Sequence, residues 1–372
     1  MRLIGDPHKP KTLIRECIGW GSMENLNWFL EMKETKGKDK IGSRHHLLPK
    51  FYMTNFANHK GKVGTINRTN GEVRLNSSPN NILIQRDFYT FLNLEMESDG
   101  SVEVLISQME GLACDVIRRR LTVFQRFPMD NDDSWALSYF AALQLLRGRR
   151  MRRTIEILGD FYAKTKLVGV NESNAREFLL DAGLDASEEE VAKLIEFKTH
   201  LPEIYITPTT NDHIQFILMS ISPWASMFRN RPISLVKFDL PILVTSDEPF
   251  LFYHEDSYRK NGIAIADEIL FPIDPKNLLV FGKMGTNDSR YIQCPSRKFD
   301  SKEFNKAMFE NSHEMVIFNP DFKFRGLNKL PKTTPLLQIQ ASSELIPENF
   351  KDNTLLRSPL SRFQVSRELG NN

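Results

Sequence analysis

Two adjacent histidines, His45 and His46, begin the stretch with the most chemical potential, Arg44-His-His-Leu-Leu-Pro-Lys-Phe-Tyr-Met-Thr-Asn-Phe-Ala57. An imidazole titrates near neutral pH, so it can transfer protons or bind a metal ion. Pro49 favours an extended backbone before it, and neighbouring side chains in an extended segment point to opposite sides. We therefore expect only one histidine to face inward. The same residue types also suit an N-terminal plug packed on the core.

Two carboxylates and an arginine could form a polar site together with the histidines. Glu103 and Glu110 share one side of a predicted helix, because seven residues make nearly two turns. Arg147 lies on the apolar side of the next predicted helix, where an arginine is rarely left unpaired. We predict that Glu110 pairs with Arg147, either as a structural ion pair between two helices or as part of a polar site.

A serine and an aspartate follow a short apolar run in Leu243-Val-Thr-Ser-Asp-Glu-Pro-Phe250. Pro249 prevents further strand pairing, and polar groups at a strand end can line a cleft. The alternative for Ser246 and Asp247 is a turn in which the aspartate binds the backbone that follows.

These segments resemble the family catalogued as domain of unknown function 4238, which opens with His-His-Tyr-(Ile/Val)-Pro-x-Phe-Tyr-Leu-x-x-Phe. The resemblance covers roughly residues 44–320. The Glu-x6-Glu spacing, the Gln144-x-x-Arg147 pair and the Thr-Ser-Asp stretch match positions that recur in the family. Glu248 replaces the usual asparagine, and Asn305 resembles a recurrent asparagine. The family has no settled activity, so the resemblance indicates which residues matter and not what they do.

We expect a polar cluster drawn from four segments to converge in one pocket. Its catalytic residues are predicted to be His46, Glu110, Arg147 and Asp247. Its substrate-binding residues are predicted to be His45, Gln144, Arg150, Ser246 and Asn305.

Two chemistries remain open for this cluster. The histidines with Glu110 and Asp247 could ligate a divalent metal such as magnesium or manganese through nitrogen and oxygen donors. A metal-free site could use His46 as a general base, with Arg147 holding a phosphate. The sequence contains no HExxH, Gly-x-Ser-x-Gly, Walker A or Gly-x-Gly-x-x-Gly motif that would decide the reaction.

A basic run at the end of the second predicted helix gives an indication of the substrate class. Residues 147–153 carry five arginines, and Arg118-Arg-Arg120 lies on the other helix. Such runs suit a phosphate backbone or form an ordinary solvated helix end. We expect a hydrolase acting on a phosphodiester or nucleotide, in the manner of a nuclease toxin or phage-defence effector. The alternatives are a non-catalytic module that binds a small anionic ligand or a partner protein, and a purely structural ion-pair network.

Composition favours a cytoplasmic protein. The 372 residues include 49 lysines and arginines and 47 aspartates and glutamates. The net charge of the chain is therefore too small to attract a polyanion by itself. The three cysteines are far apart, which argues against a disulfide framework. No signal peptide or membrane span is expected from the apolar runs. The composition says nothing about oligomeric state.

The elements that position these residues predict an α+β fold. Periodic apolar residues indicate helices over 101–121, 132–158, 171–200 (two helices), 211–228 and 302–311. Asn70-Gly71 predicts a hairpin over 62–75, and short β runs follow residue 233. We expect a central helical core with this N-terminal hairpin and C-terminal strands that form one mostly antiparallel sheet. The predicted organisation is an extension and linker (1–43), one domain (44–320) and a partly extended or disordered tail (321–372).

Overall fold

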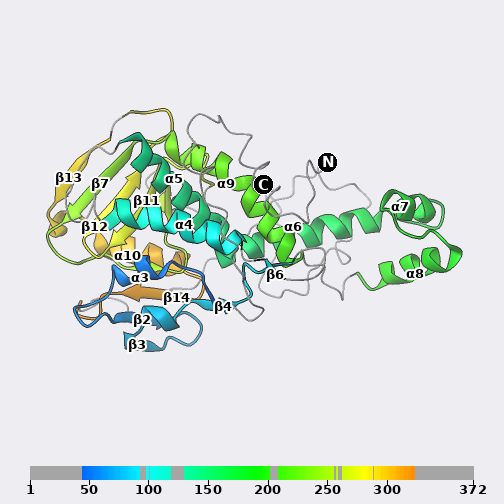
Figure 1. Ribbon diagram of the computed structural model, residues 1–372, viewed down its shortest axis with the longest axis horizontal. Helices are drawn as coiled ribbons and strands as arrows, with labels where there is room; N and C mark the ends of the chain where they lie inside the picture. Colours follow the sequence, from blue (N-terminus) through cyan, green and yellow to red (C-terminus); the bar gives the residue numbers. More distant parts are fainter. Residues whose placement is uncertain are drawn as a thin grey trace, which may run out of the picture. The chain divides into compact units, whose positions relative to one another are not determined.

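The computed structural model describes residues 44–92, 98–99, 101–118, 130–201, 208–254, 257–258, 262–287 and 289–322. Within these residues the chain divides into two compact units. The first unit holds the residues up to Met151 and those from Thr210 onward, and the second holds the residues between them. Helices and strands are both abundant (Figure 1), which confirms the predicted α+β class. The predicted extension, Arg119, Arg120 and the tail from residue 323 lie outside the described residues.

The first unit contains most of the elements. Its helices are α3 (Lys50–Thr54), α4 (Ser101–Asp115), α5 (Asn131–Leu146), the start of α6 (Arg149–Val168), α9 (Thr210–Arg229) and α10 (Ser301–Asn311). Its strands are β1 (Arg44–His46), β2 (Val63–Asn67), β3 (Val73–Ser77), β4 (Ile84–Arg86), β5 (Phe91–Leu92), β6 (Ser98–Asp99), β7 (Ile233–Phe238), β8 (Thr245–Ser246), β9 (Leu251–His254), β10 (Ser257–Tyr258), β11 (Glu268–Asp274), β12 (Asn277–Phe281), β13 (Tyr291–Cys294) and β14 (Met315–Phe318).

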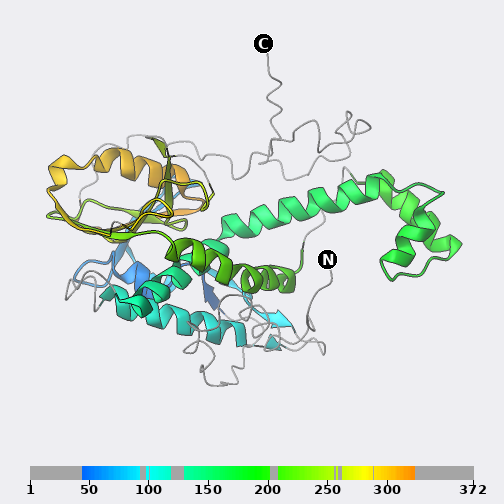
Figure 2. The ribbon, with the colours of Figure 1, turned by 90° about the horizontal axis from the view of Figure 1, so that it is seen from above.

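A six-stranded sheet with the order β10-β9-β11-β12-β7-β13 forms the centre of this unit. Its pairings are antiparallel except for β13, which runs parallel to β7. Side chains alternate between its faces: Leu235, Phe271 and Leu279 join the core shared with α4, α5 and α9, whereas Leu270 and Leu278 join the core shared with α10. Figure 2 shows α10 and the α5–α9 pair on opposite sides of the sheet.

The C-terminal strands do not form a single sheet. Strands β8 and β14 leave the six-stranded sheet and join the N-terminal hairpin in a four-stranded sheet with the order β3-β2-β14-β8. Met315 pairs with Asn67 and Phe318 with Gly64. The predicted single sheet is therefore wrong in this detail, because strand partners distant in the chain cannot be chosen from local patterning alone.

Helix α3, which carries the aromatic residues after the two histidines, connects the two sheets. The Tyr52 hydroxyl lies 2.6 Å from the Thr245 hydroxyl of β8 and donates a hydrogen bond of 2.7 Å to the Pro272 carbonyl of β11. The Tyr52 ring stacks on Phe271. Pro272 is tolerated inside the sheet because β9 pairs only with Glu268–Leu270 of its strand.

The second unit is helical. The rest of α6 is followed by α7 (Ala175–Asp181) and α8 (Glu188–Thr199), which pack together. Gly183, with φ of 71°, ends α7, and the Ser187 hydroxyl accepts a hydrogen bond from the Glu190 N–H at the start of α8. No helix in the described ranges has the length and apolarity that crossing a bilayer requires.

Candidate functional site

The site is organised around the corner between α5 and α6. The sequence predicts one continuous helix over 132–158, but the structure breaks it at Arg147-Gly148. The Glu248 carboxylate accepts a hydrogen bond of 3.0 Å from the Arg150 N–H, one of the N–H groups that a helix start leaves unpaired. A Cβ at position 148 would lie 3.1 Å from the same carboxylate oxygen. Glycine therefore lets Glu248 approach the break.

Arg147 projects from this corner into the interior. Its side chain is 1% exposed and pairs with the Glu110 carboxylate of α4, whose side chain is 23% exposed. Two further guanidinium N–H groups donate to Gln144 Oε1 at 3.1 and 2.7 Å. Burial works to lower the pKa of Arg147, but Glu110 and, more weakly, Glu103 leave that pKa above its usual value. The predicted pair is present, and its arginine is sealed from solvent.

Gln144 connects this pair to the histidine strand. Its side-chain amide donates a hydrogen bond of 3.1 Å to the carbonyl of Leu47, the residue after His46. The buried amide therefore holds the Arg147 guanidinium with one end and the backbone beside His46 with the other. Both ends of the Gln144 side chain are therefore used within the protein.

The two histidines have separate roles, as the alternation of an extended strand predicts. His45 is buried, and its Nδ1 accepts a hydrogen bond of 2.9 Å from the Tyr89 N–H. The Tyr89 hydroxyl donates to the Arg147 carbonyl at 3.3 Å, which ties the same corner again. His46 is partly exposed as a residue, but its Nε2 atom is buried, and within the described residues this nitrogen has no hydrogen-bond partner.

Opposing charges act on the His46 imidazole. Desolvation lowers the pKa of His46 below its usual value, although the Pro79 carbonyl and the Glu110 carboxylate act to raise it. The positive charge of Arg44 lowers the same pKa further. Arg44 is exposed and lies two residues from His46 on β1, hence on the same side of the strand. The site thus presents a neutral imidazole flanked by a carboxylate and an accessible cation.

Asp247 belongs to a neighbouring network. Its two carboxylate oxygens accept hydrogen bonds from the N–H groups of His313 and Glu314 at 3.0 and 2.7 Å. In the described part of the chain, no hydrogen bond or ion pair joins Asp247 to His46, Glu110 or Arg147. The carboxylate binds the turn before β14 and not the backbone that directly follows Asp247, which the turn alternative proposed. The other three predicted catalytic residues lie around Arg147.

The stability contribution of Asp247 is expected to depend on pH. Desolvation outweighs the two N–H donors and raises its pKa from 3.8 to about 6. The folded protein therefore holds this proton more tightly than the unfolded chain, so the contribution is complete below pH 3.8 and is lost as the pH rises through about 6. We expect the unfolding free energy of the wild type, minus that of Asp247→Asn, to fall by roughly 3 kcal/mol between about pH 4 and pH 7. Urea unfolding of both proteins across this pH range measures the difference. A difference that grows with pH would contradict the raised pKa of Asp247.

Two predicted substrate-binding residues have structural roles. The buried Ser246 hydroxyl donates to the Glu248 carbonyl at 2.9 Å and accepts from the Glu248 N–H at 3.2 Å. Asn305 on α10 accepts from the Val244 N–H at 3.2 Å and donates to the Ile242 carbonyl at 2.9 Å. Each side chain uses its polar atoms on the backbone around β8, so neither is available to a substrate.

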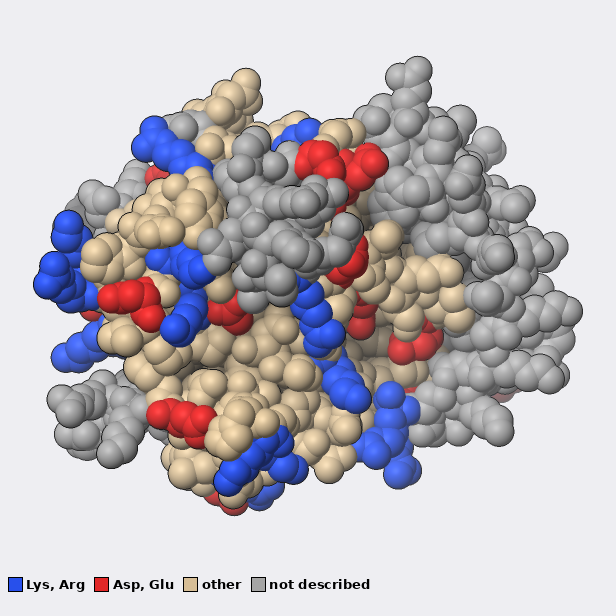
Figure 3. Space-filling model, turned by 60° about the vertical axis from the view of Figure 1, so that its left-hand side comes forward, with Lys and Arg blue, Asp and Glu red and all other residues tan. Residues whose placement is uncertain are grey.

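The basic run is largely neutralised by acidic and polar partners. Arg149 pairs with Glu314, and the Arg150 guanidinium donates to Asn311 Oδ1 at 2.7 Å. Arg152 and Arg153 both contact Glu156. On the face that Figure 3 shows, blue and red side chains of the described residues are interspersed. The run therefore lacks the unpaired cations that a phosphate backbone would bind, and Arg150 is a fold contact.

The donor set offers no support for the metal alternative. Nowhere in the described ranges do three His, Cys, Asp or Glu side chains gather in a way that could hold a metal ion. His45 uses its Nδ1 on Tyr89, and Asp247 lies in its own network. The four residues that were predicted to share a metal therefore do not form a ligand set.

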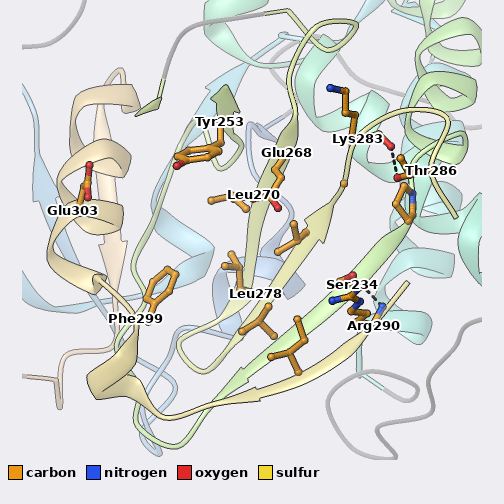
Figure 4. A pocket seen from close by; sticks show the side chains of 15 residues that line it. Ser234, Tyr253, Glu268, Leu270, Leu278, Lys283, Thr286, Arg290, Phe299 and Glu303 are labelled. Carbon is orange, nitrogen blue, oxygen red and sulfur yellow. Dashed lines mark hydrogen bonds between the residues drawn. The ribbon is translucent and has the colours of Figure 1, made fainter. Parts of the chain in front are cut away.

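A separate groove lies on the α10 side of the six-stranded sheet (Figure 4). It has a volume of about 590 Å³, with Leu270 and Leu278 in its floor and Tyr253, Glu268 and Arg290 among its other lining residues. None of the predicted site residues lines it. The groove is therefore distinct from the histidine cluster.

Fold and cluster together define an α+β protein whose buried Glu–Arg–Gln network supports a partly exposed histidine. The model of the family described as protein of unknown function DUF4238 matches residues 44–322, and the chain belongs to this family. No curated protein and no solved structure matches the chain.

Sequence reasoning missed several residues of the site. Tyr89 fixes His45 and the α5–α6 corner, and its place at the end of Arg86-Asp-Phe-Tyr89 was the available signal. Arg44 directly precedes the histidine pair and is the exposed cation of the cluster. Glu248 caps the start of α6. No local pattern shows that Glu314 and Asn311 bind the basic run.

Proposed function

We propose that this chain is a cytoplasmic hydrolase of phosphodiester or nucleotide substrates, with His46 as its acid–base catalyst. The observation that carries the proposal is the state of the His46 imidazole: its Nε2 is buried without a partner in the described residues, although the residue is partly exposed, and desolvation lowers its pKa. A neutral imidazole can accept a proton at physiological pH.

The neighbouring groups have supporting roles. As an attacking hydroxyl forms its bond to phosphorus, His46 Nε2 takes the hydroxyl proton and later returns it to the departing oxygen, so protons balance. The Glu110 carboxylate stabilises the imidazolium formed in between, since its charge already raises the pKa of His46. Arg147 and Gln144 are positioning residues. Arg44 supplies the exposed positive charge that favours an anionic substrate.

The test is turnover of single-stranded RNA, DNA of the same sequence, and nucleoside triphosphates, each with and without magnesium or manganese. We expect cleavage of one class by the wild type. In Glu110→Gln, the pKa of His46 falls, so the acid limb of the pH–rate profile moves to lower pH.

One alternative remains a defined outcome of the same experiment. A non-catalytic module would gain thermal stability with one anionic ligand class, lose that gain in Arg44→Gln, and release no product. That result would replace the hydrolase by a binding function at the same residues.

A further inference from the structure

The α7–α8 hairpin, residues 171–199, buries very little of itself. Within the described residues, only Ala175 and Leu179 of α7 are buried, and α8 has no buried residue. Helices of 7 and 12 residues are marginal on their own, since short isolated helices gain too little to offset nucleation. Their stability must come from packing that the hairpin does not supply.

Large apolar side chains point outward from this hairpin. Leu180 is 62% exposed, Leu184 58% and Phe197 43%. The start of the hairpin and the end of α8 also form a slot of about 410 Å³, lined by Val170, Asn171, Glu172, Ile195, Lys198 and Thr199. Exposed apolar side chains and a concave slot on one hairpin are features of a surface that binds another protein segment.

The charge of the hairpin identifies the kind of segment. Residues 171–199 contain eight acidic and three basic side chains, a net formal charge of −5. The three basic groups are used internally: Arg176 donates to the Ala186 carbonyl, Lys193 pairs with two glutamates of α8, and Lys198 donates to the Val170 carbonyl. An acidic hairpin with exposed apolar side chains complements a basic amphipathic helix.

We propose that the α7–α8 hairpin is a docking surface for a basic amphipathic helix of a partner protein. The apolar side of that helix covers Leu180, Leu184 and Phe197, and its lysines or arginines face the carboxylates. The proposal does not depend on the chemistry of the His46 cluster.

The test uses the full chain and a fluorescent peptide of about 14 residues, which makes four helical turns, with leucines at i, i+4, i+7 and i+11 and lysines elsewhere. One comparison peptide has glutamates in place of the lysines, and another has serines in place of the leucines. Anisotropy titrations are expected to show binding of the first peptide alone, weakened by added salt. The variants Leu180→Ser and Phe197→Ser are each expected to lower its affinity about tenfold or more.

The matched control is Leu240→Ser, which removes an equally exposed leucine (57%) from the first unit and is expected to leave affinity unchanged. Circular dichroism verifies that each variant keeps its helix content. Equal binding of the lysine and glutamate peptides, or undiminished binding by Phe197→Ser, would overturn the proposal. A concentration-dependent dimer lost in Phe197→Ser, without peptide binding, would overturn it in favour of a second copy of this chain.

Discussion

Replacing Arg147 by methionine is expected to lower the free energy of unfolding by about 3–5 kcal/mol, because it removes one partner of a buried ion pair. Glu110 would lose its guanidinium, and Gln144 Oε1 would lose both of its donors. Each polar group left without a partner adds its own desolvation cost. Urea unfolding followed by circular dichroism measures the change.

Two further variants show whether the loss comes from the unpaired charge. The double variant Arg147→Met/Glu110→Gln should be more stable than Arg147→Met alone, since no uncompensated carboxylate remains. Arg74→Met removes an arginine from the exposed pair with Glu72 and should leave the unfolding midpoint unchanged. A single variant as stable as the wild type would show that Arg147 does not hold the helices together.

Replacing His46 by asparagine is expected to lower the cleavage rate about 10²- to 10⁴-fold, the range for loss of a general acid–base group. The unfolding midpoint should change little, because the His46 Nε2 that is removed is a buried nitrogen without a hydrogen bond to the described residues. Initial rates on the substrate class that the wild type cleaves, measured across pH, test both the size of the loss and the disappearance of the acid limb.

The neighbouring histidine provides the matched control. His45→Ala should cost about 1–3 kcal/mol of stability, because the buried Tyr89 N–H loses its acceptor. Its folded fraction should cleave at a rate close to that of the wild type. Equal rates for His46→Asn and the wild type would exclude His46 from the chemistry.

Helical periodicity was sufficient to predict the pairing of two helices through Glu110 and Arg147. An arginine and a carboxylate on semi-apolar faces need a partner, and each helix offered one. The alternation of His45 and His46 followed equally from strand geometry. Both inferences depend on the direction in which a side chain leaves its own helix or strand. The regular geometry of that element fixes this direction.

The sequence could not show which distant groups meet. The break at Gly148 depends on Glu248, about 100 residues away, whose carboxylate binds the first turn of α6. The arginines after it are occupied by Glu314 and Asn311 from the other end of the domain. The hydrogen-bond partners of Asp247 could not be predicted for the same reason: a strand end places a carboxylate but not the N–H groups that it will meet.

The four-stranded sheet has a consequence for the order in which the protein assembles. Strand β2 pairs with β14, whose residues lie about 250 positions later, and Tyr52 bonds across 193 and 220 residues. Contacts between such distant residues close long loops and slow folding. During synthesis, the segment around the two histidines and strand β2 leave the ribosome long before β8, β11 and β14 are made. Until then, one edge of β2 has no partner strand. The chain therefore completes this domain only after residue 318 has been made.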